Sequence, residues 1–141
     1  MIWGDRLLDG ETTGIGIWQA SMNETHRTID LIPKDVLIFD WHYENAEMTP
    51  AYFAIKGFNV VSCPWNRPDI SQKQIDDMIR LRRDGSYAIT TRCLGIIQTI
   101  WCAVPDFLLS YYSPSAYTII NDIKKEKKKK TSLKNQQVTL A

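Results

Sequence analysis

Four short apolar runs, rich in β-branched and aromatic residues, punctuate the chain and limit the folds open to it. Each run is bounded by polar or turn residues and has the length and composition of a strand rather than a helix. Because the runs are continuously apolar and do not alternate, they are typical of parallel strands that are covered on both faces. The runs are residues 2–3, 36–39, 58–63 and 95–102.

Helix signals occupy the segments between these runs. Segment 49–57 opens with Thr-Pro, an N-cap residue followed by a proline in the first turn, and closes with a glycine. In segment 71–85, Ser71 and Gln74 form a capping-box pattern, and Gly85 marks the stop. Two more helices are expected, over residues 24–32 and 113–123.

The alternation of strands and helices predicts right-handed βαβ units and a parallel sheet, and so an α/β protein. The spacing of the strands fits a (β/α) barrel, whose eight units need ~250 residues. With 141 residues, the chain has room for about half of such a barrel. We therefore expect a parallel half-barrel over residues 1–121, resembling strands five to eight of a TIM barrel, and a basic helix end and tail over 122–141.

The charges are unevenly distributed along the chain. Residues 1–120 hold ten Lys/Arg and fourteen Asp/Glu, whereas residues 121–141 hold seven Lys and two acidic residues. An acidic folded part argues against duplex binding, because phosphate neutralisation supplies most of that affinity. No uncharged apolar stretch reaches the ~18–20 residues of a membrane helix, and the N-terminal residues lack the pattern of an export signal. We expect neither nucleic acid nor membrane as a partner, and the localisation stays open.

Neither the cysteines nor the glycines indicate a cofactor. The three cysteines, Cys63, Cys93 and Cys102, lie in apolar surroundings without metal-ligand spacing, and we expect them to be buried and unreactive. The Gly14-Ile15-Gly16 segment lacks the third glycine and the preceding strand of a dinucleotide site. We therefore expect no cofactor.

Four of the five tryptophans, Trp3, Trp41, Trp65 and Trp101, stand at or just past the carboxyl ends of the predicted strands. In a parallel sheet those ends meet on one face, where α/β barrels build their sites. Indole planes stack on the C–H faces of sugar rings, so this recurrence favours a carbohydrate site over mere packing of strand on helix. Short hydrogen-bonding side chains accompany the indoles: Asp5, Asp40, His42, Asn66, Gln98 and Thr99.

The segment after the second strand carries the densest chemistry. By strand parity, Asp40 and His42 share one face, while the bulky Trp41 and Tyr43 share the other. We expect the bulky set to face the helices, so that Asp40 and His42 point toward the barrel mouth. Two weaker alternatives stay open: a metal site of Asp40, His42 and Glu44, and an acid–base pair of Asp40 and Glu44.

Four strand-end motifs together carry a resemblance to a known family: Met1-Ile2-Trp3-Gly4-Asp5, Asp40-Trp41-His42-Tyr43, residues 57–64 and residues 95–101. In this order, over residues 1–110, they resemble the last four strands of the catalytic barrel of family 20 glycoside hydrolases, the β-N-acetylhexosaminidases. The resemblance implies a pocket for a terminal N-acetylhexosamine, walled by Trp3, Trp41 and Trp101. It also implies that Trp101 is the plate under the sugar ring.

The same resemblance implies that the chain is catalytically incomplete by itself. The family's Asp-Glu pair ends its fourth strand, ahead of the four strands matched here, and its chemistry is substrate-assisted. Ala103 stands where the family usually has a sugar-binding glutamate. Trp65, Asn66 and Asp69 are nearest to the tyrosine and aspartate that usually follow the seventh strand.

From these observations we predict the substrate-binding half of a glycoside hydrolase that acts on terminal N-acetylhexosamine-type sugars. Its open strand edges would pair with a missing N-terminal half or with a second copy of the chain. Two alternatives stay open: a non-catalytic carbohydrate-binding module, and a truncated product without independent activity. The predicted binding residues are Trp3, Asp5, Asp40, Trp41, His42, Trp65, Asn66 and Trp101.

Overall fold

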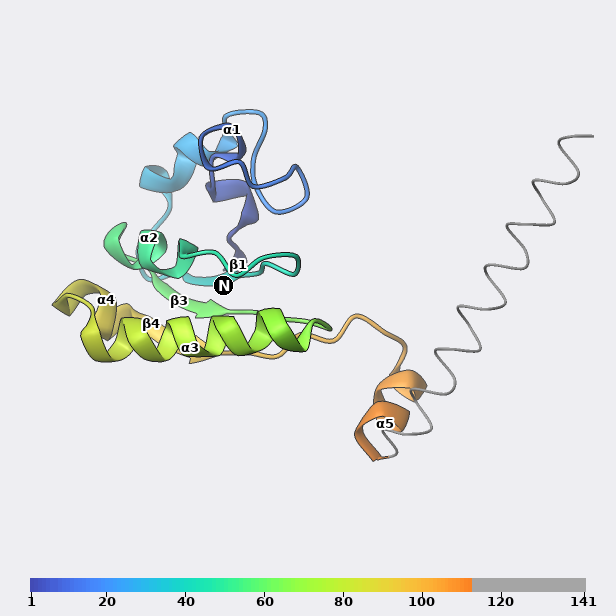
Figure 1. Cartoon of the computed structure of the whole chain (residues 1–141). Coiled ribbons are helices and arrows are strands. Elements are labelled where there is room, and N and C mark those ends of the chain that lie inside the picture. Colours follow the sequence, from blue (N-terminus) through green and yellow to red (C-terminus); the bar gives the residue numbers. More distant parts are fainter. Residues whose placement is uncertain (113–141) are drawn as a thin grey trace, which may run out of the picture. The chain divides into compact units, whose positions relative to one another are not determined.

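The computed structural model describes residues 1–112 and divides the chain into two compact units, residues 1–99 and residues 100–141 (Figure 1). The first unit alternates strands with helices, and the described part of the second unit is one helix, α5 (Val104–Tyr112). The helix predicted over 113–123 and the basic tail lie outside the described residues. The elements of the first unit are β1 (Ile2–Trp3), η1 (Asp5–Leu7), α1 (Gly10–Thr13), η2 (Thr25–Leu31), β2 (Leu37–Asp40), α2 (Thr49–Ile55), β3 (Asn59–Ser62), α3 (Pro68–Asp84), α4 (Tyr87–Arg92) and β4 (Cys93–Ile96).

The four strands form one sheet in which every neighbouring pair is parallel and the spatial order is β1-β2-β3-β4. Ile38 of β2 lies between Ile2 of β1 and Val60 of β3, and Val60 in turn lies beside Cys93 of β4. Strands that are neighbours in sequence are therefore neighbours in space, as successive βα units require. The prediction of an α/β protein with a parallel sheet is confirmed.

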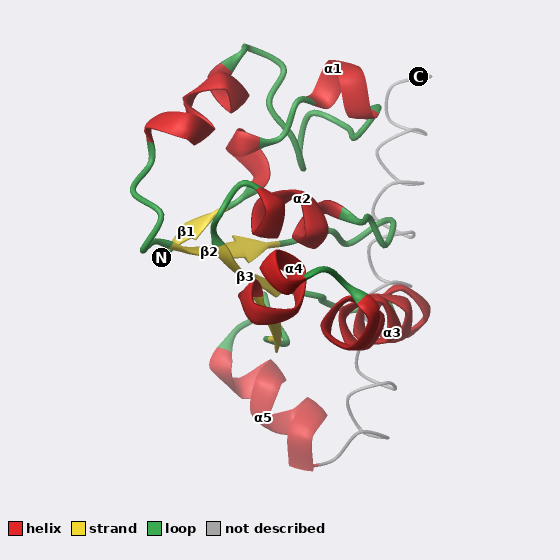
Figure 2. Cartoon of the chain, turned by 90° about the vertical axis from the view of Figure 1, so that its left-hand side faces the viewer, coloured by secondary structure: helices red, strands yellow, loops and turns green. Residues whose placement is uncertain are grey.

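The core lies between the sheet and the helices that cover one of its faces. Figure 2 shows α2, α3 and α4 on the same side of the strands. Ile38 and Val60 point to this side and are fully buried with Phe53 and Phe58. Burying an aliphatic or aromatic side chain of this size contributes roughly 1.5–3 kcal/mol, so this layer carries much of the unit's stability. Gly4 packs tightly here, since a Cβ at that position would lie 2.9 Å from both Ile38 Cγ2 and Phe53 Cζ.

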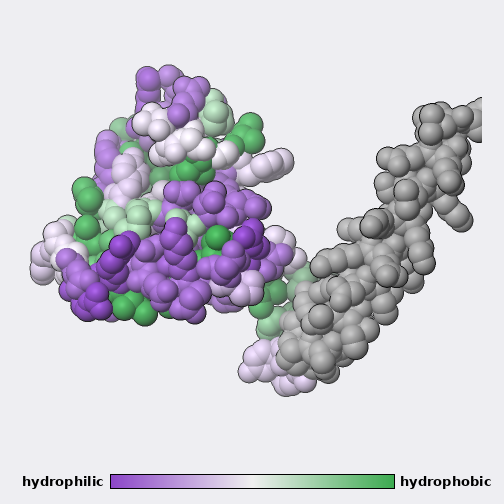
Figure 3. Space-filling model, in the orientation of Figure 1, coloured by the Kyte–Doolittle hydropathy of each residue, from purple (hydrophilic) through white to green (hydrophobic). Residues whose placement is uncertain are grey.

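The helices begin and end largely where the sequence predicted, with one exception. Helix α2 begins at Thr49, and the chain turns at Gly57 with a positive φ of 92°. Helix α3 ends at Gly85 as predicted. It begins at Pro68, so the prediction that Ser71 and Gln74 form a capping box at its start is wrong. Proline suits the first turn of a helix because it lacks an N–H, and it starts α3 one turn earlier. The outer face of α3 is hydrophilic (Figure 3).

The fourth strand lies earlier than predicted. It spans Cys93–Ile96 and follows directly on α4, a short helix that the sequence analysis missed. After Ile96 the backbone no longer pairs with β3 as a strand. A single hydrogen bond still links the two segments, from the Thr99 N–H to the Pro64 carbonyl at 2.8 Å. Trp101 is therefore not at a strand end, contrary to prediction. The predicted strand end was too late because the apolar run 95–102 continues beyond Ile96, the last residue that pairs with β3.

Candidate functional site

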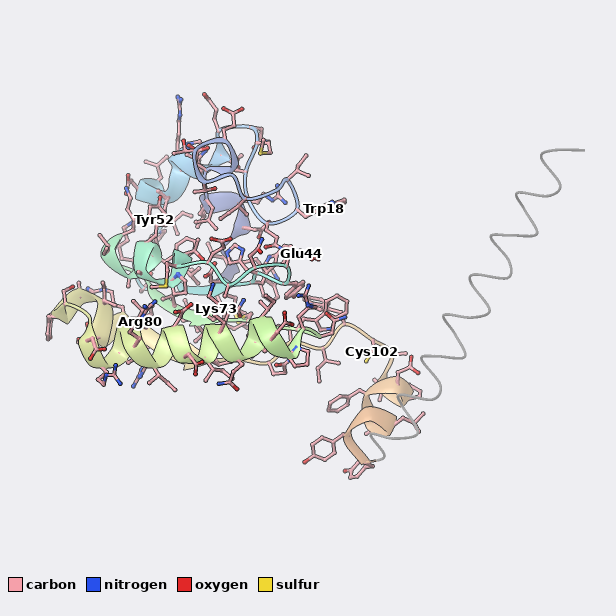
Figure 4. All side chains as sticks on the ribbon, in the orientation of Figure 1. Trp18, Glu44, Tyr52, Lys73, Arg80 and Cys102 are labelled. Carbon is pink, nitrogen blue, oxygen red and sulfur yellow. The ribbon has the colours of Figure 1, made fainter. Side chains whose placement is uncertain are left out.

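A pocket of about 440 Å³ opens where three loops of the first unit meet. The loops follow α1, β2 and β3, and the last two leave the carboxyl ends of neighbouring parallel strands. This is the edge of the sheet at which the sequence predicted a site. In Figure 4, Trp18 of the first loop and Glu44 of the second lie on the same side of the unit. The lining residues are Thr13, Gly14, Ile15, Gly16, Trp18, Gln19, Trp41, Tyr43, Glu44, Asn45, Glu47, Trp65 and Asn66.

Three aromatic rings in contact form one wall of this pocket. The ring centroids of Trp41 and Tyr43 are 4.9 Å apart, and those of Tyr43 and Trp65 are 5.3 Å apart, both pairs tilted. The Tyr43 hydroxyl lies 3.2 Å from Thr99 Oγ1, which in turn donates to the Pro64 carbonyl at 2.7 Å. The middle ring of the wall is thus tethered through Thr99 to the backbone of the loop after β3.

Asp5 holds the Trp41 indole in place. The Trp41 Nε1–H donates to Asp5 Oδ1 at 3.2 Å, and the other oxygen of Asp5 accepts from Arg6 Nε at 2.7 Å. Asp5 is buried and belongs to η1, the short helix directly after β1. The prediction grouped Asp5 with the binding residues. The structure gives it a positioning role behind the indole rather than a place in the lining.

Trp18 lies on the loop after α1, which also contributes to the lining, and the sequence analysis did not include it in the site. Its side chain is 80% exposed, yet its loop is anchored by Arg6. The Arg6 guanidinium donates to the carbonyls of Ala20 at 3.1 Å, Ile17 at 3.2 Å and Trp18 at 3.4 Å. A fixed backbone therefore carries an indole that is free to contact a ligand.

Asp40 and His42 face the helices, and the prediction that they point to the barrel mouth is wrong. Both side chains are 2% exposed. Asp40 Oδ2 accepts from the Thr49 hydroxyl of α2 at 2.7 Å, and Asp40 Oδ1 lies 3.1 Å from His42 Nε2. The His42 carbonyl accepts from Gln74 Nε2 of α3 at 2.6 Å. The prediction that Asp40 and His42 share one face is correct, since both lie on the face of buried Ile38. The prediction of which face packs against the helices was reversed.

The reversal has a physical cause. A carboxylate can be buried when hydrogen-bond donors satisfy it, and here a helix hydroxyl and an imidazole do so. The bulky Trp41 and Tyr43 are then left for the pocket. His42 still acts on the site indirectly, because its Nδ1 lies 2.9 Å from Oε1 of Gln19, a lining residue.

The predicted residues are therefore only partly brought together. Trp41, Trp65 and Asn66 line the pocket, and Asp5, Asp40 and His42 support it from behind. Trp3 packs its ring edge-on against Phe39 at 5.4 Å and is not among the lining residues of this pocket. Trp101 belongs to the second unit. Lining residues outside the predicted binding set include Trp18, Gln19, Tyr43, Glu44, Asn45 and Glu47; of these, Glu44 had been considered only for a metal or acid–base site, and Tyr43 had been expected to face the helices.

The structure does not bring together the residues that the metal site and the acid–base pair would require. Glu44 lines the pocket with a side chain that is 77% exposed, whereas Asp40 and His42 are buried behind it. Over residues 1–112, no group of three metal-binding side chains is found. In the same stretch, none of the helices has both the length and the apolar character needed to cross a membrane.

The fold and the pocket define the class of the chain: an α/β protein with an aromatic pocket at the carboxyl ends of its parallel strands. Comparison with protein-family models and with curated proteins finds no match to this chain.

The cysteines differ in reactivity. Burial raises the pKa of Cys63 to about 12 and that of Cys93 to about 11, so both remain neutral thiols at neutral pH. Cys102 is exposed, and its predicted burial is wrong. Because the thiolate is the nucleophile, we expect an alkylating reagent at neutral pH to label only Cys102 in the folded chain and all three cysteines after denaturation. Mass spectrometry checks this, and rapid native labelling of Cys63 or Cys93 would contradict it.

Proposed function

We propose that this chain is the saccharide-binding half of a glycoside hydrolase barrel that acts on terminal N-acetylhexosamine-type sugars and is catalytically incomplete alone. The observation that carries the proposal is the aromatic pocket at the strand ends, with Trp18, Trp41 and Trp65 among its lining residues. Indoles offer broad apolar planes that match the C–H faces of pyranose rings.

The polar lining suits a sugar as well. Side-chain amides of Gln19, Asn45 and Asn66 can each donate and accept, as sugar hydroxyls and an acetamide require. The pocket volume of about 440 Å³ falls in the usual range for small-molecule sites, ~300–1,000 Å³. It has room for one or two sugar rings rather than a long chain.

The sheet supports the half-barrel part of the proposal. All-parallel sheets are normally covered on both faces, yet the described helices of the first unit cover one face. Trp3, at 41% exposure, and Leu94, at 45%, stand on strands of this sheet with much of their apolar surface exposed. We propose that four further βα units complete the barrel and supply the acidic pair that the resemblance assigns to catalysis.

One observation favours the second candidate, a non-catalytic carbohydrate-binding module. Every lining residue of the pocket lies between Thr13 and Asn66, so the pocket needs neither Trp101 nor another chain to form. The two candidates predict different roles for Trp101. It is the plate under the sugar in the first and dispensable in the second.

The test is a calorimetric titration of the full chain with the β-1,4 disaccharide of N-acetylglucosamine. We expect binding; the first candidate predicts that Trp101→Ala weakens it at least about tenfold, and the second predicts that it does not. Unchanged affinity in Trp101→Ala supports the binding module instead. Absence of binding by the folded wild-type chain overturns both candidates.

A further inference from the structure

The charge of the pocket is one-sided. Its lining includes two carboxylates, Glu44 and Glu47, from the loop after β2, and no lysine, arginine or histidine. The first unit as a whole is acidic, with thirteen Asp/Glu against ten Lys/Arg over residues 1–99. A ligand in the pocket therefore meets a negative field that nothing in the lining opposes.

Two arginines contact the loops of the pocket, and both also bond to other groups. Arg67 pairs with Asp69 through two bonds, Nη2 to Oδ2 at 2.7 Å and Nε to Oδ1 at 3.1 Å, and it forms a longer ion pair with Glu44, Nη1 to Oε2 at 3.9 Å. The hydrogen bond from Arg67 lowers the pKa of Asp69, which keeps that partner ionised. Arg6 pairs with Asp5 at 2.7 Å and spends its remaining donors on backbone carbonyls. Over residues 1–112, Glu44 therefore has one long ion pair and Glu47 has none, so both carboxylates are accessible to a cationic ligand.

The aromatic rings act in the same direction. The face of an indole carries partial negative charge and attracts a cation within about 6 Å of its centroid. Trp18, Trp41 and Trp65 all line the pocket together with the two carboxylates. Indole faces beside carboxylates are the groups that recognise an ammonium ion, and they repel sulfate or carboxylate groups.

We propose that this pocket ranks hexosamines by charge, binding sugars with a free, protonated amine most tightly, neutral N-acetylated sugars less tightly and sulfated sugars least. Glu44 and Glu47 are the specificity-determining residues. This inference rests on the proposed function, since it assumes that the pocket binds a saccharide. It adds a charge preference at the same site: among hexosamines of equal size, a protonated amine strengthens binding and a sulfate weakens it.

The test compares three ligands on the wild-type chain by calorimetry, at mildly acidic pH and low salt. They are the β-1,4 disaccharide of glucosamine, its N-acetylated form and the 6-O-sulfated N-acetylated form. We expect the first to bind about threefold to tenfold more tightly than the second, and the third to bind more weakly by a similar factor. The ratio between the strongest and the weakest of these three affinities, here called the spread, is expected to shrink at high salt, because exposed charges are screened.

A charge-neutral variant separates this preference from the bulk of the acetyl and sulfate groups. In the double variant Glu44→Gln with Glu47→Gln, we expect the spread among the three ligands to fall by at least about threefold. The matched control is Asp35→Asn, which removes an exposed carboxylate at the amino end of β2, the opposite end of the strand from the pocket. It is expected to leave the spread unchanged.

Each outcome has one meaning. Equal affinity for the three ligands, or an undiminished spread in the double variant, overturns the charge preference and leaves the proposed function standing. Binding of none of the three ligands by the folded chain overturns the proposed function itself. Binding of the free-amine disaccharide alone overturns the proposed function, because the N-acetylated sugar is the substrate it names, and leaves charge as the property that the pocket selects.

Discussion

Trp41→Ala is expected to weaken binding of the N-acetylglucosamine disaccharide by at least about tenfold, or roughly 1.4 kcal/mol. Trp41 is a fixed part of the aromatic wall, because its ring contacts Tyr43, it lines the pocket and its Nε1–H donates to Asp5. Alanine removes the stacking plane and leaves Tyr43 without its neighbour on that side. Calorimetric titration of wild type and variant measures the loss.

Two further variants show which property of Trp41 matters. Trp41→Phe keeps an aromatic plane but loses the hydrogen bond to Asp5, so we expect an intermediate affinity. Tyr87→Ala is the matched control, since Tyr87 is an aromatic residue with 82% exposure that lies on α4 and outside the lining. It is expected to bind like wild type. Wild-type affinity in a folded Trp41→Ala protein would remove the aromatic wall from the binding site.

Much of the fold follows from the sequence because its signals are local. The β-branched runs at residues 36–39 and 58–63 became β2 and β3 within one residue at each end, and glycines end α2 and α3 where a helix stop was expected. Competing signals explain the failures. Pro68 starts α3 before the Ser71 capping box can act, and the run 95–102 stays apolar after its pairing with β3 has ended.

The site was less predictable because its geometry depends on contacts between distant segments. The strand-end positions of Trp41 and Trp65 are visible in the sequence, and both line the pocket. The sequence gives no such indication for Trp18, because its loop is held at the pocket by contacts with distant residues: hydrogen bonds from Arg6, twelve residues away, and the contact of Gln19 with His42. The direction of Asp40 was equally hidden, since it depends on Thr49 and His42 as partners.

Side-chain exposure also distinguishes residues that line the pocket from residues that support it. The three described side chains that hold the site from behind, Asp5, Asp40 and His42, are buried, whereas Trp18 in the lining is largely exposed. Substitutions behind the site are therefore expected to act through stability and ring orientation. Substitutions in the lining are expected to act on affinity alone.

Asp40→Ala is expected to destabilise the first unit by about 3–5 kcal/mol, the largest effect of any single substitution considered. The change leaves two buried groups, the Thr49 hydroxyl and His42 Nε2, without the acceptor they share, and it opens a small cavity between β2 and α2. It also frees His42 from its hold beside Gln19, so the pocket loses a fixed amide. Urea denaturation of wild type and variant measures the loss of stability.

Milder changes at the same cluster separate the contribution of the carboxylate from that of its partners. Thr49→Val removes one donor and keeps the shape of the side chain, and because Asp40 retains His42 we expect a loss of about 1–2 kcal/mol. Asp40→Asn keeps the volume but replaces one acceptor oxygen with a donor, so its effect is expected to fall between the other two. This order follows from the number of buried polar atoms that each change leaves unsatisfied. A loss below about 1 kcal/mol for Asp40→Ala would mean that water reaches this carboxylate, and that the buried Asp40–His42 pair does not hold the second strand to the helices.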